Sequence, residues 1–264
     1  MIISNIVAIA QKELRSYFYS PLAYIIAAFF WFISGFFFIE ILIGDRGIIQ
    51  QVLLGEQTGS IVAPIDVATE FINSYLAILG TLSLLVIPVL SMGLYAEEKK
   101  LGTIELLATS PITNWAVASG KLIAAILLFT FILLPSFLLE AIALSAAEPP
   151  LPIAIPLLAH LGLILLGSAL LAIGMFISSL TVSNIVAAIS TFGVILIFWA
   201  LDLAANNLSG SLSQVLGYIS LLQSYNNLVR GVLIVSDIVL FLSYIFLGLF
   251  LTSQSINLFR FNQH

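Results

Sequence analysis

Residues 149–201 read PPLPIAIPLLAHLGLILLGSALLAIGMFISSLTVSNIVAAISTFGVILIFWAL and contain no charged residue. A single helix of that length, rising about 1.5 Å per residue, would be far longer than a bilayer is thick. The chain must therefore fold back within this stretch, and the polar run at residues 178–184 is the natural turn. This pattern predicts two membrane-spanning helices, at residues 153–178 and 184–201.

The composition of the whole chain agrees with a membrane protein. Hydrophobic residues make up 61% of the 264 residues and charged residues only 8%, against about 25% charged in a soluble domain. So few charges exclude a soluble enzyme. The net charge of −5 excludes a nucleic-acid binder, because nothing in it attracts phosphates. The absence of cysteine excludes disulfides, thiolate metal sites and cysteine nucleophiles.

Four further apolar runs are each long enough to cross a bilayer, which takes about 20 residues in a helix. They lie at residues 22–43, 74–95, 115–142 and 238–258. Pro88 and Pro135 fall inside two of them and predict kinks, since membrane spans tolerate proline. The expected fold is an all-α integral membrane protein with six transmembrane helices, forming one domain over residues 1–264.

Six spans place both termini on one side, and the basic residues indicate which side. Two basic residues, Arg46 and Arg230, fall on the side opposite the termini. Six fall on the side of the termini: Lys12, Arg15, Lys99, Lys100, Lys121 and Arg260. By the positive-inside rule we expect both termini in the cytoplasm.

The residues before the first span form a helical pattern of their own. Apolar side chains recur at helical spacing over residues 1–20, and Ser20-Pro21 then interrupts the helix. This pattern predicts an amphipathic helix lying in the inner membrane interface. An ordinary charged flank remains the alternative.

The loop between the second and third spans, residues 96–112, concentrates charge. It begins AEEKKLGTIELLATSP at residues 96–111. Gly102 can end the second span, and the Thr103 hydroxyl can cap a new helix. That short apolar helix would contain Leu106 and Leu107 and stop before Pro111. Its leucines either dock on a partner or fold back on the membrane, and the residues alone leave both open.

This loop resembles that of ABC-2-type transporter permeases. The shared pattern is Glu97-Glu98-Lys99-Lys100-x-Gly102-Thr103-x-Glu105-Leu106-Leu107, followed by Ser110-Pro111 and Lys121. The amphipathic N-terminus is similar to the family's elbow helix, and the turn at 178–184 to its second cytoplasmic loop. Arg230-Gly231 followed by Asp237 resembles the segment before the last span. The likeness is closest to the gliding-motility-associated and copper-maturation branches.

The resemblance implies the transmembrane half of an ATP-driven exporter in a bacterial inner membrane. Such a permease pairs with a second copy or a related permease, and each half receives a separate ABC ATPase that binds ATP and magnesium. Residues 102–110 would form the coupling helix that docks on the ATPase. The residues implied in ATPase coupling are Glu97, Glu98, Gly102, Thr103, Glu105, Leu106, Leu107 and Pro111.

No catalytic or cofactor-binding motif is visible in the sequence. Gly120-Lys121 is followed by Leu122, and Trp115 occupies the position of the first glycine of a Walker A motif. We therefore expect a non-catalytic subunit without cofactor or metal. A secondary active carrier and a non-transporting membrane anchor for an ATPase remain the alternatives.

Few ionisable residues fall near the spans. His160 lies within the fourth span, where we expect a hydrogen bond inside the bundle. Four carboxylates lie close to the outer span ends, where we expect them in the headgroup region: Glu40, Glu140, Asp202 and Asp237. This placement disfavours a proton-driven carrier, which usually needs an ionisable group inside the membrane.

Two other patterns concern packing. Small residues in the fourth span, such as Gly167 and Gly174, allow close helix approach, within one subunit or between two. Apolar residues in the segment 202–236 predict short amphipathic helices resting on the outer membrane surface or dipping into it. Nothing in the sequence identifies the transported substrate.

Overall fold

The computed structural model describes residues 2–58, 66–103, 112–148, 150–207 and 210–261. Every regular element in these ranges is a helix, and six helices among them are long and apolar enough to cross a membrane. The predicted all-helical fold with six spans is therefore confirmed. The spans are α2 (Pro21–Ile43), α4 (Val67–Ser91) with α5 (Gly93–Lys100), α7 (Asn114–Leu144), α8 (Ala154–Leu180), α9 (Asn184–Asn207) and α12 (Val235–Phe261).

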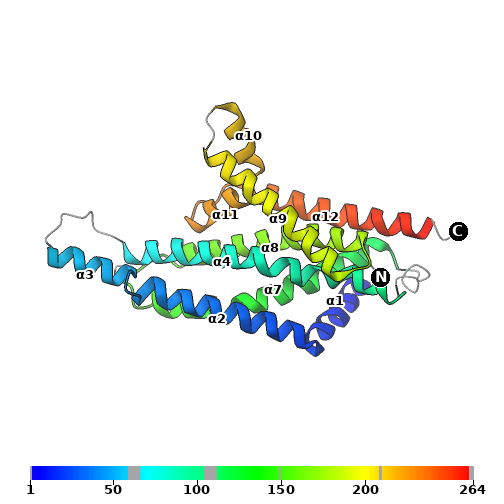
Figure 1. Ribbon diagram of the computed structural model, residues 1–264, viewed down its shortest axis with the longest axis horizontal. Coiled ribbons are helices and arrows are strands. Elements are labelled where there is room, and N and C mark those ends of the chain that lie inside the picture. Colours follow the sequence, from blue (N-terminus) through cyan, green and yellow to red (C-terminus); the bar gives the residue numbers. More distant parts are fainter. Residues whose placement is uncertain (1, 59–65, 104–111, 149, 208–209, 262–264) are drawn as a thin grey trace.

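Four shorter helices lie at the two ends of the bundle that the spans form. Helix α1 (Ile2–Tyr19) lies at the same end as α5 and the last turns of α12, which we call the terminal end (Figure 1). The other three lie toward the opposite, distal end: α3 (Ile48–Thr58), α10 (Ser211–Ile219) and α11 (Leu221–Val229). Helices α2, α4, α7, α8 and α12 run roughly along the longest dimension of the molecule, whereas α9 runs obliquely to α10, which projects away from the bundle (Figure 1).

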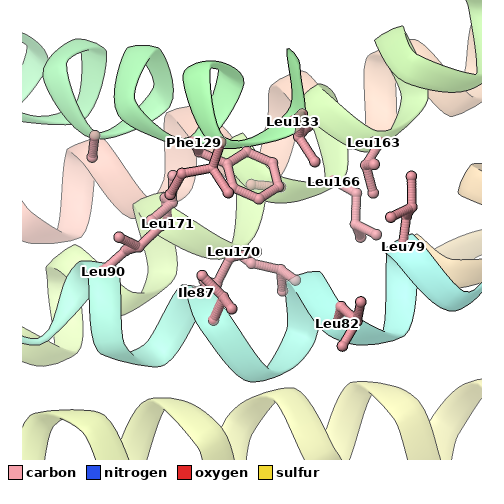
Figure 2. Close-up of a cluster of buried hydrophobic side chains, with 14 of the residues drawn as sticks. Leu79, Leu82, Ile87, Leu90, Phe129, Leu133, Leu163, Leu166, Leu170 and Leu171 are labelled. Atoms are coloured by element: carbon pink, nitrogen blue, oxygen red, sulfur yellow. The ribbon is translucent and has the colours of Figure 1, made fainter. Parts of the chain in front are cut away.

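Helix α8 is the centre of the bundle. It is the most buried of the spans, whereas α2, α9 and α12 present most of their apolar side chains outward. Figure 2 shows its leucines, Leu163, Leu166, Leu170 and Leu171, between side chains of α4 and α7. Because lipid is as apolar as a protein core, the exposed apolar faces of the outer helices suit a bilayer.

Small residues let α8 approach its neighbours closely. A Cβ atom added at Gly167 would lie 2.2 Å from Cε1 of Phe129 on α7, and one at Gly174 would lie 2.2 Å from Oγ of Ser91 on α4. On α12, a Cβ at Gly248 would lie 2.6 Å from the backbone of Ala172. Packing within one chain therefore accounts for the small residues of this span.

The distal segment forms two short helices, as its sequence predicts. Helices α10 and α11 both form, but α11 packs into the bundle with Tyr225 and Leu228 fully buried. The Tyr225 ring lies against Gly80 of α4, and its hydroxyl donates to the Leu76 carbonyl at 2.7 Å. Helix α11 thus rests on protein and forms part of the distal end of the bundle.

Candidate functional site

A serine of α8 interrupts the second span near the terminal end. The Ser178 hydroxyl accepts hydrogen bonds from the backbone N–H groups of Tyr95 (3.1 Å) and Ala96 (3.0 Å), and it donates to the Met92 carbonyl at 2.7 Å. In an unbroken helix those two N–H groups would bond to carbonyls four residues earlier. A side chain inserted into this ladder breaks a helix. The interruption therefore falls at Met92, between α4 and α5, one turn after the predicted kink at Pro88.

Helix α5 ends as the sequence predicts, at Gly102. This glycine has φ +71°, a conformation that strains other residues. Its N–H donates to the Lys99 carbonyl and that of Thr103 to the Glu98 carbonyl, which is the Schellman pattern of helix termination. The Thr103 hydroxyl also bonds back to the Glu98 carbonyl at 3.3 Å. Thr103 thus takes part in closing α5, and the helix that we expect it to cap lies outside the described residues.

The remaining residues of the predicted coupling helix, Glu105, Leu106, Leu107 and Pro111, lie outside the described residues. Where the chain is described again, Thr113 caps α7 by accepting from the Ala116 N–H. Asn114 is the first residue of α7, and its side-chain amide donates to the side-chain carbonyl of Asn257 on α12.

Lys121 joins three helices at the terminal end. Its ammonium lies 3.1 Å from Glu13 of α1 and 2.9 Å from Glu98 of α5, and its side chain is only 3% exposed. It also lies 5.3 Å from the centre of the Tyr95 ring. An unpaired ammonium would be costly in such a place, so the two carboxylates are what make this lysine tolerable. The group ties α1 and α5 to α7, and we call it the Lys121 cluster.

Tyr17 of α1 lies close to the Lys121 cluster. Burial raises its pKa above the ordinary value, and the nearby charges of Glu13, Glu98 and Glu97 raise it further. The phenol is therefore neutral at physiological pH. The net negative charge around it has one buried cation, Lys121, among the described residues of the cluster.

Lys99 adds a further contact between α5 and α8. Its ammonium donates to the Ser179 backbone carbonyl, which also accepts from the Ser255 hydroxyl of α12 at 3.2 Å. Of the predicted coupling residues, Glu98 and Gly102 thus take part in fixing the end of α5, while Glu97 is exposed. Glu13, Ser178 and Ser179 were not predicted for this site from the sequence. No local pattern distinguishes them, since their partners are distant in sequence.

The distal carboxylates are not where we expected them. Glu40 is exposed, but Glu140 is completely buried, and Asp202 and Asp237 are both 8% exposed. Asp202 accepts from the Ser220 hydroxyl at 2.6 Å, and Asp237 accepts from Ser224 and Asn227 at 3.0 Å each. Three of the four are therefore enclosed by the bundle instead of facing the headgroup region: Asp202 and Asp237 accept hydrogen bonds there, and Glu140 is surrounded by other side chains.

His160 fits the expectation of a hydrogen bond within the bundle. Its Nδ1 lies 3.0 Å from the Pro156 carbonyl. Within the part of the chain that is described, no group of three or more His, Asp or Glu residues could hold a metal ion.

Comparisons with known proteins identify the family. Residues 7–263 match the family described as "ABC-2 family transporter protein". The chain is also 28% identical over 121 residues to "Probable multidrug ABC transporter permease YbhR" of Escherichia coli strain K12, and equally to the protein of that name from strain O157:H7. The match covers 46% of this chain and 31% of those relatives. The chain thus aligns with about a third of the length of the curated relatives.

Proposed function

The chain belongs to the ABC-2 family of transporter proteins, and we propose that it is the membrane permease of an ABC exporter whose ATP hydrolysis takes place in a separate ATPase subunit. The observation that carries this proposal is the attachment of α5. This short helix leads directly into the predicted coupling residues, and it is bonded to α1 and α7 through the Lys121 cluster and to α8 through Ser178.

These attachments suggest how force would pass into the bundle. A partner that binds the chain after Thr103 would move α5 first, because the Schellman turn at Gly102 and Thr103 connects that part of the chain closely to α5. Helix α5 is separated from α4 by the break at Met92, so it can tilt without bending α4. The buried ion pairs and the Ser178 hydrogen bonds then transmit that tilt to α1, α7 and α8.

We further propose that two such permeases assemble around the transport path and that both termini lie in the cytoplasm of a bacterium. The partner ATPase would bind ATP and magnesium, and this chain would bind no cofactor. The description of YbhR as a multidrug transporter permease supports export as the direction of transport. The loop motif at residues 97–107 supports the narrower assignment to the gliding-motility-associated or copper-maturation branches.

The first test is purification of the tagged full chain from its native membrane in mild detergent. We expect a stoichiometric partner with a Walker A motif. The partner should be lost when Leu106 and Leu107 are both changed to Glu, and retained in the control Leu53→Glu, which alters an exposed leucine of α3. A pure, folded complex without any ATPase would contradict the exporter and favour the secondary carrier.

A second measurement separates an exporter from a non-transporting anchor. The purified complex is reconstituted into lipid vesicles, and ATP-dependent movement of candidate amphipathic compounds across the bilayer is followed. An exporter accumulates at least one compound on the side opposite its ATPase. An anchor hydrolyses ATP while no compound moves.

A further inference from the structure

A carboxylate and an imidazole face each other inside the distal half of the bundle. Oε2 of Glu140 on α7 lies 3.6 Å from Nε2 of His160 on α8. Glu140 is 0% exposed and His160 7% exposed. Neither oxygen of Glu140 nor Nε2 of His160 has a hydrogen-bond partner among the described residues. Buried polar atoms of native proteins nearly always have one.

The contact of the other imidazole nitrogen, Nδ1, determines whether Nε2 carries a hydrogen in the neutral ring. Nδ1 of His160 is 3.0 Å from the Pro156 carbonyl, and a carbonyl oxygen can only accept. Nδ1 therefore carries the hydrogen. In a neutral ring Nε2 is then a bare acceptor, and it faces the oxygens of Glu140, which are also acceptors when ionised. Two acceptors face each other favourably only if a proton lies on one of them.

No further cation pairs with Glu140 among the described residues, where its one ion pair is with His160. The titratable groups on the distal parts of the neighbouring helices are acids or phenols: Glu40 on α2, Glu70 and Tyr75 on α4, Asp202 on α9, Tyr225 on α11, and Asp237 and Tyr244 on α12. Arg230, which directly follows α11, is exposed. An ionised carboxylate buried without a cation costs several kcal/mol. A bound proton removes that cost, whether it resides on the carboxylate or on the imidazole.

Helix α11 covers the bundle next to this pair. A Cβ atom added at Gly162, two residues from His160, would lie 2.9 Å from Leu228 of α11, and one at Gly80 would lie 2.8 Å from the Tyr225 ring. Helix α11 has nine residues and is followed by Gly231 at φ +75°. Displacing α11 would uncover the parts of α4 and α8 that it covers near the pair.

We propose that Glu140 and His160 form a binding site for a single proton, which exchanges with the solution at the distal end when α11 moves away from the bundle. In the closed state the proton lies between carboxylate and imidazole, and the pair is neutral. When water enters, the proton passes to water and leaves the carboxylate ionised beside a neutral imidazole. This site goes beyond the proposed exporter function and does not depend on an ATPase.

The test uses infrared spectroscopy of the full chain in lipid vesicles at about pH 7, well above the ordinary glutamic acid pKa of about 4.3. In parallel, nitrogen NMR of labelled histidine reports the charge of the imidazole, with His264→Gln leaving only His160. We expect either the carbonyl band of a carboxylic acid or an imidazolium signal. It should disappear in Glu140→Gln and persist in Glu148→Gln, an exposed carboxylate near the same end. An ionised carboxylate with a neutral imidazole in the wild type would overturn the proposal without any variant.

The role of α11 is tested by the rate at which that proton exchanges with deuterium. Tyr225→Phe removes the hydrogen bond to the Leu76 carbonyl, and we expect exchange about fivefold faster, the effect of one ordinary hydrogen bond. The control is Tyr218→Phe, because Tyr218 is 76% exposed on α10. Equal rates in the two variants would show that α11 does not control access to the pair.

Discussion

Replacing Ser178 by alanine tests how α5 is attached to the bundle. The substitution removes the acceptor of two buried N–H groups, Tyr95 and Ala96, and the donor to the Met92 carbonyl. Each unpaired buried N–H costs about 1–3 kcal/mol. With no rearrangement the two donors would cost about 2–6 kcal/mol. Some of these N–H groups can instead bond to carbonyls of their own helix, which lowers the cost. We therefore expect Ser178→Ala to reduce the free energy of unfolding by about 3 kcal/mol.

The neighbouring serine is a matched control. Ser179 is as completely buried as Ser178, but its hydroxyl donates only to the Phe176 carbonyl, three residues earlier in the same helix. Its contacts with Lys99 and Ser255 use the backbone carbonyl, which alanine keeps. We therefore expect Ser179→Ala to cost about 1 kcal/mol or less.

Unfolding of the purified chain in mixed micelles of increasing SDS content would give both values, with helix content followed by circular dichroism. Equal losses for Ser178→Ala and Ser179→Ala would refute the reasoning, because they would mean that the helix ladder between α4 and α5 closes without the serine. In a complex with the proposed ATPase, Ser178→Ala should also weaken the coupling between ATP hydrolysis and transport.

Three further predictions concern single features of the chain. Lys121→Met leaves Glu98 largely buried without this cation and leaves Glu13 with only the exposed Lys12 among its described ion-pair partners. It should destabilise the chain by about 3 kcal/mol in the same unfolding measurement. Adding Glu13→Gln and Glu98→Gln should recover most of the loss, and no recovery would contradict the ion-pair account. Gly102→Pro cannot adopt φ +71° and should uncouple ATP hydrolysis from transport while the chain still inserts, whereas Gly102→Asn, which tolerates that conformation, should remain coupled. The pKa of Asp66 is lowered, chiefly by the hydrogen bond from the Thr69 hydroxyl, so the capping of α4 by this carboxylate should stabilise the chain above about pH 4. That stabilisation should be lost as the pH falls through the lowered pKa. A difference in thermal unfolding between wild type and Asp66→Ala that does not depend on pH would contradict this prediction.

Features set by local chemistry could be predicted from the sequence. The six apolar runs are long enough to span a bilayer whatever surrounds them, and the structure contains six such helices. Gly102 ends α5 because the left-handed conformation that closes a helix favours glycine in any context. The amphipathic helices of the distal segment follow from the spacing of their apolar residues, although this spacing does not distinguish a membrane surface from a protein surface as the partner of α11.

Features that depend on how helices cross could not be predicted. The break at Met92 follows from a serine more than 80 residues away, and a sequence with Pro88 nearby points instead to the proline. Glu13 and Lys121 are 108 residues apart, and only the packing of α1 on α7 makes them a pair. We expected Glu140 in the headgroup region because it is near the end of its span, but the position of a residue along a helix does not determine whether its side chain points into the bundle.

The charge of buried carboxylates is neutralised in different ways at the two ends of the bundle. At the terminal end, the largely buried carboxylates Glu13 and Glu98 face Lys121, a cation that belongs to the chain. Such an arrangement holds α1, α5 and α7 together, which suits the proposed transmission of force. At the distal end, the ion-pair partner of Glu140 among the described residues is His160, so we take the neutralising charge to be a proton from water. The distal end is therefore the part of the molecule whose stability can change when water gains access to it, and α11 controls that access.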